Sequence, residues 1–597
     1  MITLGDFIIK FLVSKKIDRV FLITGGAIAF VIDAFSRTKK IKYTCVAHEQ
    51  AAAMMADAYY RASKKLSVTM VTSGPGAQNL ITGIACSWFD SIPSIHISGQ
   101  VNSSELSSYS KNTKNVRQIG FQETDIVSIV KPITKFAYQL KNCNEIRFVL
   151  EKAFYEATSG RPGPVLVDIP MDIQKKLIQP KKLKKFVFKQ ILKKKDYSEI
   201  IVNLLRLSKR PVIILGGGIK NSNSEKILEK FLRKINTPLV STWSGFGLVP
   251  SSKKNYIGNV GVYGSRSANF AVQNADLILN LGSRLDTRVT GGKPETFAKN
   301  ARIVSVDIDK YELGKKRGLE NFLSINQDLK IFFNNFLKFS NKFIFKANSI
   351  WLNQCYFWKE NYSNHKPQHQ KQKKFVNPYY FMKILSKISN PNDIIIADDG
   401  AHLTWTMQGF EIKKNQLLFS AFGNSPMGYA LPASIGASFS NKNRKVICID
   451  GDGSIQINIQ ELQTVRFNKL PIKIFIINNQ GYGIIKQFQS LYLKNRFEAS
   501  IPSKGVTNPD FEKISRAYGL DYYKINTNTE IEKILKKIFS TNRPEIIEVF
   551  LKPNQKIIPK LEFGRPIEDL SPLLPRKELN KIMINRVVKD FKKIIQV

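Results

Sequence analysis

The segment that runs from Val446 to Asn479 constrains the fold more than any other part of the chain. Residues 446–449 are a short apolar run that stops at the acidic, glycine-containing turn 450–453. A second apolar run, residues 471–477, ends on Asn478 and Asn479. With a helix expected over residues 459–467 between them, these runs predict a strand–helix–strand unit of a buried parallel sheet.

This unit would bring Asp452 and Asn479 to the same edge of the sheet, where open α/β sheets bind ligands. Carboxylate and amide oxygens without Cys or His suit Mg²⁺, which keeps part of its water shell and bridges to phosphates. Either turn alone is equally consistent with an ordinary loop. The two together predict a magnesium site.

The spacing of Gly451-Asp452-Gly453 and Asn478-Asn479 resembles the diphosphate-binding signature of thiamine-diphosphate (ThDP) enzymes. Residues 451–464 resemble, almost letter for letter, the catalytic subunits of the acetohydroxyacid (acetolactate) synthase family. The resemblance implies three Mg²⁺ ligands, which are Asp452, Asn479 and the carbonyl oxygen of Gly481. It also implies cofactor contacts from Gly451, Gly453 and Ser454.

Residues 1–175 alternate apolar runs with helical segments, which predicts a doubly wound parallel sheet. Glu49 follows one of these strands and begins an alanine-rich helix that carries almost no charge, so we expect its carboxylate to be partly desolvated. A glutamate at a helix N-terminus is also favoured by the helix dipole alone, and the residues leave both explanations open. The resemblance matches Glu49 to the family's catalytic glutamate, which contacts the aminopyrimidine ring of ThDP.

Further matches in this region imply other site residues. Phe121 and Gln122 correspond to residues that line the substrate and cofactor site, and Lys135 to a lysine at its entrance. Arg161 corresponds to an arginine that contacts a flavin. The implied ThDP contacts in the glycine-containing turns are Gly26, Ala27 and Gly76.

Residues 199–335 predict a second α/β unit, with Gly216, Gly217 and Gly218 after its first strand. Glycines at a strand end let a phosphate approach the backbone, although three glycines alone are a weak signal. Residues 282–291 resemble the family's flavin-domain motif, which implies bound FAD with a mainly structural role and argues against a dehydrogenase. The matching positions are Gly282, Arg284, Asp286, Arg288, Asp307 and Asp328.

Residues 376–555 predict the third sheet, and residues 556–597 a C-terminal tail. His402 matches a phosphate-contacting histidine, and Met427 the apolar residue that bends ThDP. Phe488 stands where the family usually has a tryptophan that favours 2-ketobutyrate, so we expect a weaker preference for that acceptor. The tail is more similar to relatives from surface-polysaccharide pathways, and its position allows it to serve as a lid.

The net charge of 91 − 47 = +44 is spread over the whole chain. Abundant Lys, Ile, Asn and Phe indicate A/T-rich codon usage, and we expect no specific nucleic-acid partner. No apolar window suggests a membrane span, the N-terminus does not resemble a signal peptide, and the five cysteines form no CxxC pair. We therefore expect a cytoplasmic protein. Residues 176–198 and 336–375 are expected to be polar connectors.

The sequence thus predicts three doubly wound parallel-sheet domains of the ThDP-enzyme type. The first functional hypothesis is decarboxylation of pyruvate and transfer of the two-carbon unit to a second 2-keto acid, as in branched-chain amino-acid biosynthesis. The second is a related carboligase with another acceptor, such as a keto-sugar, and the third is a polyanion-binding protein without catalysis. The resemblance implies a homodimer or homotetramer, with room for a regulatory small subunit.

Overall fold

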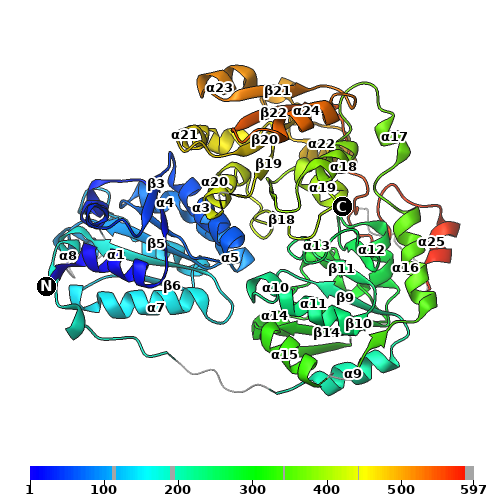
Figure 1. The fold of residues 1–597 in the computed structure, drawn as a ribbon, viewed down its shortest axis with the longest axis horizontal. Helices are drawn as coiled ribbons and strands as arrows, with labels where there is room; N and C mark the ends of the chain where they lie inside the picture. Colours follow the sequence, from blue (N-terminus) through cyan, green and yellow to red (C-terminus); the bar gives the residue numbers. More distant parts are fainter. Residues whose placement is uncertain (110–115, 189–194, 320, 340–342, 442, 585–597) are drawn as a thin grey trace.

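The computed structural model describes residues 1–584 apart from 110–115, 189–194, 320, 340–342 and 442. It contains three six-stranded sheets, each of them parallel throughout and covered by helices (Figure 1). The predicted fold class of three parallel α/β sheets is confirmed. The three sheets fall within residues 19–170, 211–326 and 394–550.

The N-terminal sheet has the strand order β3-β2-β4-β5-β7-β6. Its central strands are buried from end to end because helices cover both faces, which explains their continuous apolar runs. The strands are β2 (Arg19–Leu22), β3 (Lys42–Cys45), β4 (Val68–Val71), β5 (Ser94–Gln100), β6 (Phe136–Gln139) and β7 (Pro164–Pro170). The main helices are α1 (Leu4–Ser14), α3 (Glu49–Ser63), α5 (Ile81–Asp90) and α7 (Ile146–Thr158).

The central sheet has the order β12-β11-β9-β13-β14-β15. Its strands are β9 (Pro211–Leu215), β11 (Leu239–Ser241), β12 (Tyr256–Asn259), β13 (Leu277–Leu281), β14 (Arg302–Asp307) and β15 (Phe322–Asn326). Helices α9 (Ser198–Leu207), α11 (Glu225–Lys234), α12 (Arg266–Gln273) and α15 (Leu329–Phe339) cover it. The predicted first strand, before the triple glycine, corresponds to β9.

The C-terminal sheet has the order β18-β17-β19-β20-β22-β21. Its strands are β17 (Ile394–Ala397), β18 (Leu417–Phe419), β19 (Val446–Gly451), β20 (Ile472–Asn478), β21 (Asp521–Ile525) and β22 (Glu545–Phe550). β19 and β20 are neighbours in parallel register, as the opening motif predicts. The segment between them forms a 3₁₀ helix (Ile455–Glu461) followed by α21 (Leu462–Phe467), so the expected single helix is two short ones.

Helix α3 of the N-terminal domain packs closely on α20 (Ala430–Ser440) of the C-terminal domain (Figure 1). The approach depends on small residues, because a Cβ atom at Gly436 would lie 2.2 Å from the carbonyl oxygen of Met55. Next to this contact the Tyr429 hydroxyl donates to Asp57 Oδ1 at 2.6 Å. Glu461 Oε1 accepts the backbone N–H groups of Ala47 and His48, which fixes the start of α3 against the same domain.

The two expected connectors are more structured than predicted. In residues 176–198, β8 (Leu177–Ile178) pairs with β1 (Ile2–Thr3), and Phe186 packs edge-on against Phe148. In residues 336–375, α16 (Ser349–Asn361) buries a face that contacts α12, and this face contains Trp351, Leu352, Cys355 and Trp358. The prediction of a polar connector was therefore wrong for α16, which belongs to the central domain.

The described part of the tail, up to residue 584, crosses the outside of the central domain and ends in α25 (Arg576–Ile582) (Figure 1). Ile567, Leu570 and Leu579 are buried in the core that contains α12. The Asn269 side chain donates to the carbonyl of Ile567 at 2.7 Å, and Gln273 Nε2 donates to Glu568 Oε2 at 2.5 Å. Most of this segment is therefore a packed strap, and its role as a lid stays a prediction.

Among the described helices, none has both the length and the apolar composition needed to cross a bilayer.

The strap should loosen as pH rises through the titration of Glu568. Burial raises the pKa of this carboxyl to about 6 from its ordinary value of 4.5, although the bond from Gln273 opposes the shift. The pKa of Glu568 is higher in the folded protein than in the unfolded chain. Its contribution to the free energy of unfolding is therefore complete below pH 4.5 and is lost as pH rises through about 6. A shift of this size corresponds to about 2 kcal/mol.

We expect Glu568→Gln to remove this pH dependence. Hydrogen exchange of residues 567–583 is measured at pH 4.5 and at pH 7.5 and corrected for intrinsic exchange. Between these two pH values the protection factors of the wild type should fall by roughly thirtyfold more than those of the variant. Parallel curves for the two proteins would contradict the assignment. The exposed Glu532→Gln in α24 (Ile531–Phe539) is a suitable control.

Candidate functional site

Glu49 is the first residue of α3, directly beyond the carboxyl end of β3, and its residue surface is 8% exposed. Asn79 Nδ2 donates to Glu49 Oε2 at 2.9 Å. The other oxygen, Oε1, faces the turn after β4, where a Cβ on Gly76 would lie 3.4 Å from it. The carboxylate is thus held on one oxygen, and the second oxygen borders a backbone without a side chain.

Other predicted residues gather at the same edge of the N-terminal sheet. Gly26 and Ala27 lie in the short helix after β2, and the Ala27 carbonyl accepts a bond from Gln174 Nε2. Gln122 packs against the turn after β4, since a Cβ on Gly74 would lie 2.8 Å from the Gln122 carbonyl. Its neighbour Phe121 is 85% exposed, an unusual state for a large apolar side chain.

The C-terminal domain places Asp452 in the turn after β19 and Asn479 in the turn after β20. Asp452 Oδ2 accepts the backbone N–H of Gly481 at 3.1 Å and Asn508 Nδ2 at 2.8 Å, which ties the two turns together. The Asp452 carboxylate is buried, which raises its pKa, although both of these bonds favour its charged form. This oxygen-rich donor set fits Mg²⁺.

A second acidic cluster lies behind this turn. Ligand atoms of Asp398, His402 and Asp450 are within 4.8 Å of one another, and all three residues are buried. His402 Nε2 and Asp450 Oδ2 have no hydrogen-bond partner among the described residues. Burial lowers the pKa of His402 to about 3 and raises that of Asp450 to about 7, so the imidazole is neutral. Of the two sets, the Asp452 turn has the oxygen ligands that Mg²⁺ prefers.

A cavity of about 400 Å³, here called the central cavity, opens at the carboxyl ends of the central strands. Residues 89–91 and Arg161 of the N-terminal domain and Phe422 of the C-terminal domain complete its wall. Most residues that the flavin motif implied line this one space. They are Arg161, Gly217, Gly218, Gly282, Arg284, Asp286, Arg288, Asp307 and Asp328. Gly216 does not line it, because it packs against the Gly282 carbonyl, 2.2 Å from where its Cβ would be.

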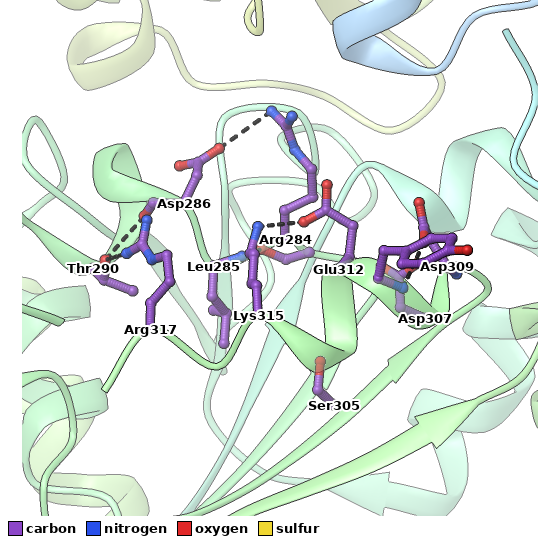
Figure 2. Close-up of polar contacts among 12 residues, drawn as sticks. Arg284, Leu285, Asp286, Thr290, Ser305, Asp307, Asp309, Glu312, Lys315 and Arg317 are labelled. Carbon is purple, nitrogen blue, oxygen red and sulfur yellow. Dashed lines mark hydrogen bonds and ion pairs between the residues drawn. The ribbon is translucent and has the colours of Figure 1, made fainter. Parts of the chain in front are cut away.

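The charges around the central cavity are partly neutralised within the protein. Figure 2 shows the loop after β13, where Arg284 pairs with Asp286 at 3.3 Å. Arg161 Nη1 pairs with Asp309 Oδ2 at 2.9 Å and with Glu312 Oε1 at 3.0 Å. The Arg288 guanidinium lies 4.7 Å from the ring centre of Trp243, and its buried Nη1 has no partner among the described residues.

Arg288 also lines a second space of about 320 Å³, here called the Phe488 cavity. The central domain, the C-terminal domain and the tail all contribute to it. Its wall contains Trp243, Tyr263, Arg288, Asp399, Gly400, Leu403, Thr404, Ser425, Ile484, Ile485, Phe488 and Lys560. Gly400 connects it to the buried cluster, since a Cβ there would lie 2.6 Å from the His402 ring.

Comparison with known proteins agrees with this architecture. The chain matches the thiamine pyrophosphate enzyme N-terminal TPP binding domain over residues 2–129, the central domain over residues 199–336 and the C-terminal TPP binding domain over residues 398–549. It is 34% identical to the acetolactate synthase large subunit of Cyanidium caldarium, over 95% of this chain and 96% of that protein. It is 33% identical to acetolactate synthase 3, chloroplastic, of Brassica napus, over 95% and 86%.

The chain belongs to the acetolactate synthase family of ThDP enzymes. It is an acetolactate synthase-like, ThDP-dependent transferase. Glu49 thus lies in the N-terminal TPP binding domain, whereas Asp452 and Asn479 lie in the C-terminal one. Neither the central cavity nor the Phe488 cavity includes Glu49 or Asp452.

Two residues that the sequence predicted for the site, Lys135 and Met427, line neither cavity and contact neither Glu49 nor Asp452 among the described contacts. Lys135 lies before β6, at the amino end of the N-terminal strands, and its ammonium donates to the carbonyls of Glu156 and Ser159 at the end of α7. The structure does not bring it together with Glu49, so its place at an entrance stays a prediction. Met427 is half-buried in the loop that Asp398 and Asp399 hold through Gly428 and Ser425.

Several residues of the site carry no signal in the sequence. Asn79 is 30 positions from Glu49, and Asn508 is 56 positions from Asp452. Lys486 Nζ donates to the carbonyl of Asn479 at 3.1 Å and so braces the metal turn from behind. The lysine follows the Asn-Asn pair closely, and this proximity is the single clue that could have identified it.

The two turns make a testable prediction about metal binding. Asp452→Asn should raise the Mg²⁺ concentration needed to half-saturate ThDP binding by about a hundredfold, because a neutral amide replaces the carboxylate ligand. Asn508→Ala should raise it by about tenfold, because it removes only the bond that orients the ligand.

Binding is measured by titration calorimetry of ThDP at a series of Mg²⁺ concentrations. Asn361→Ala, which removes an exposed amide that donates to the Phe357 carbonyl of its own helix, is the control. Unchanged Mg²⁺ dependence in Asp452→Asn would show that the metal binds elsewhere, with the Asp398–Asp450 cluster as the first alternative.

Proposed function

We propose that this chain releases carbon dioxide from pyruvate, with ThDP and Mg²⁺ bound, and joins the remaining two-carbon unit to a second 2-keto acid. The pathway that this reaction serves in the proposal is branched-chain amino-acid biosynthesis. The observation that supports it most directly is the buried Glu49 carboxylate, which Asn79 holds on one oxygen at a sheet edge in the N-terminal TPP binding domain. When bound, ThDP supplies the electron sink for the reaction.

Glu49 provides a positioned proton acceptor. Its Oε2 is occupied by Asn79, whereas Oε1 faces the side-chain-free turn at Gly76. In this proposal Oε1 would bind a pyrimidine ring nitrogen of the cofactor and share a proton with it. A carboxylate fixed in this manner is oriented before the substrate arrives, which removes part of the entropic cost of proton transfer.

The C-terminal domain would hold the diphosphate. Asp452, Asn479 and Gly481 supply oxygen ligands for Mg²⁺, and the neutral His402 has an unpartnered Nε2 that can donate to a phosphate oxygen. Gly451 and Gly453 let the rings of His402 and Tyr482 pack against this turn, since a Cβ at either glycine would lie within 2.7 Å of one of these rings. In this proposal these residues bind and orient the diphosphate and its metal ion, and they take no part in proton transfer.

A homodimer belongs to the proposal. Glu49 and Asp452 share neither of the two cavities, and the exposed Phe121 lies at the Glu49 edge as if another surface covered it. In the proposed dimer the Glu49 edge of one chain faces the Asp452 turn of its partner. A homotetramer would contain the same pair of contacts.

FAD is the proposed occupant of the central cavity, where it would have a structural role. Support comes from the position of this space at the carboxyl ends of parallel strands and from the residues of the flavin motif that line it. Gly217 and Gly218 follow β9 and leave their backbone accessible at the cavity wall, as a dinucleotide phosphate requires.

A second candidate is a related carboligase with a different acceptor, such as a keto-sugar. The Phe488 cavity favours it, because Phe488 replaces the usual tryptophan and Lys560 comes from the atypical tail. Acetolactate formed from pyruvate alone by the holo-protein supports the first candidate. Carbon dioxide release without acetolactate supports the second.

Replacement of Glu49 tests the proton acceptor. Glu49→Gln should lower carbon dioxide release from pyruvate by at least about a hundredfold, because an amide cannot exchange a proton with the pyrimidine ring, while the circular dichroism spectrum stays unchanged. The matched control is the exposed Glu532→Gln. Release within about threefold of the wild-type rate in Glu49→Gln would remove the central element of the proposal.

Flavin retention tests the central cavity. We expect the purified protein to show flavin absorbance bands and to release about one FAD per chain on acid denaturation. Arg284→Gln should weaken FAD retention, since it removes a cation from the cavity wall, whereas Arg233→Gln on the exposed face of α11 should not. A protein that remains colourless after incubation with excess FAD would leave the cavity without this occupant.

A further inference from the structure

A buried glutamate lies behind the turn that follows β20, residues 479–481, here called the metal turn. Glu548 is in β22, the strand next to β20 (Figure 1), and its residue surface is 5% exposed. Its Oε1 accepts a hydrogen bond from Asn478 Nδ2 at 2.6 Å, and its Oε2 accepts one from the Tyr522 hydroxyl of β21. Two neutral donors, one from the strand on either side, therefore hold this carboxylate.

Glu548 forms no ion pair with any described residue. Lys524, which is beside it in the strand register, pairs with Glu512 at 2.8 Å instead. By contrast, Glu545 of the same strand is buried with its carboxylate 2.7 Å from Lys473 Nζ. Burial of a carboxylate without a cation is unfavourable to folding, and an apolar side chain would avoid this cost. Net stability therefore does not account for Glu548, and the groups bonded to it point to another role.

The three bonded residues form a diagonal row across one face of the sheet. Ile476 is beside Glu548 in the register, and Asn478 follows Ile476 by two residues, so it shares that face. Tyr522 precedes Lys524 by two residues and shares the face for the same reason. Burial raises the pKa of the Tyr522 hydroxyl, and the bond to Glu548 raises it further, so the phenol keeps the proton that it donates.

Glu548 determines which way the Asn478 amide points. A carboxylate only accepts hydrogen bonds, so the amide must turn its Nδ2 group toward it. Its Oδ1 then faces the metal turn and accepts the backbone N–H of Gln480 at 3.0 Å. Gln480 has a φ of +54°, in the left-handed region that residues other than glycine seldom adopt. The Asn478 side chain thus supports an unfavourable backbone conformation through a local turn of the kind that asparagine favours.

The metal turn contains two of the three implied Mg²⁺ ligands, Asn479 and Gly481, one on either side of Gln480. The Gly481 N–H donates to Asp452 Oδ2 at 3.1 Å, so the position of the turn also affects the third ligand. A change in the Gln480 backbone would therefore displace the oxygen ligands together. The bond between the Asn478 amide and the Gln480 N–H opposes such a change.

We propose that Tyr522 and Glu548 are positioning residues of the metal site and that they act through Asn478. Tyr522 orients the carboxylate, the carboxylate orients the Asn478 amide, and the amide holds the turn that presents its oxygen ligands to Mg²⁺. The inference rests on the proposed function, since it specifies how the proposed metal site is kept in shape.

The Mg²⁺ requirement of ThDP binding measures this role. Titration calorimetry of the full chain gives the Mg²⁺ concentration that half-saturates ThDP binding. Glu548→Leu should raise this concentration by about 10–100-fold, the usual effect of losing a residue that orients a metal ligand. Saturating Mg²⁺ should then restore the wild-type affinity for ThDP, which damage to the fold would not permit.

Milder variants and a control complete this series. Glu548→Gln, which keeps one acceptor oxygen and the shape, and Tyr522→Phe should each raise the Mg²⁺ requirement by about threefold to tenfold. Tyr523→Phe should leave it unchanged, because Tyr523 is on the opposite face of the same strand. A Mg²⁺ requirement that stays within about twofold of the wild type in Glu548→Gln and in Tyr522→Phe would overturn the proposal.

A double variant tests the route through Asn478. Asn478→Ala alone should raise the Mg²⁺ requirement at least as much as Glu548→Leu does. Adding Glu548→Leu to it should change the requirement by less than about twofold, because the carboxylate then has no amide to orient. Effects that multiply in the double variant would show that Glu548 acts by another route and would refute the proposal.

Hydrogen exchange of the full chain without cofactor distinguishes failure of this inference from failure of the proposed function. If the wild type does not bind ThDP in the presence of Mg²⁺, the proposed function is wrong, and the amides of residues 480 and 481 then decide the inference by themselves. Their exchange should be at least about tenfold faster in Glu548→Gln than in the wild type or in Tyr523→Phe. Equal exchange in all three proteins would show that Glu548 does not hold the turn.

Discussion

The contact between α3 and α20 fixes the relation of the two TPP binding domains within one chain, and a buried ionic network accompanies it. Asp57 accepts bonds from Arg61, Tyr429 and Ser87, and Arg61 reaches on to Asp90. Removing one partner of a buried pair costs about 3–5 kcal/mol, whereas a well-packed apolar substitute is often neutral. The network is therefore better understood as a device for alignment than as a source of net stability. It sets the position of the helix that begins with Glu49.

The central domain shares in this alignment because its strand ends face both other domains. Residues from all three domains line the central cavity. In addition, Arg161 of the N-terminal domain pairs with Asp309 and Glu312, which follow β14. A ligand in this space would contact all three domains at once. Binding of such a ligand would stabilise the arrangement of the domains through mass action, which would give the proposed flavin a structural role.

Much of the fold could be predicted because parallel strands that are buried on both faces consist of continuous apolar runs in the sequence. β9, β13, β19 and β20 are examples, and each ends on residues whose chemistry marks the ligand edge. The failure at α16 has an equally specific cause. Its polar residues face solvent and dominate the composition, whereas Trp351, Leu352, Cys355 and Trp358 carry the helical periodicity that should have identified a packed face.

The site could be predicted only where function is concentrated in short motifs. Asp452 and Asn479 lie at the ends of neighbouring strands, so chain order alone brings their turns together. Asn508, Lys560 and Asn79 reach the site from loops, from the tail and from a separate helix, and their positions depend on tertiary packing that no local pattern encodes. The Phe488 cavity is the clearest case, because Trp243, Asp399 and Lys560 come from three separate parts of the chain. Motifs thus specify the chemistry common to a family, whereas a cavity such as this one is lined by side chains spread over the sequence and becomes visible only in the folded chain.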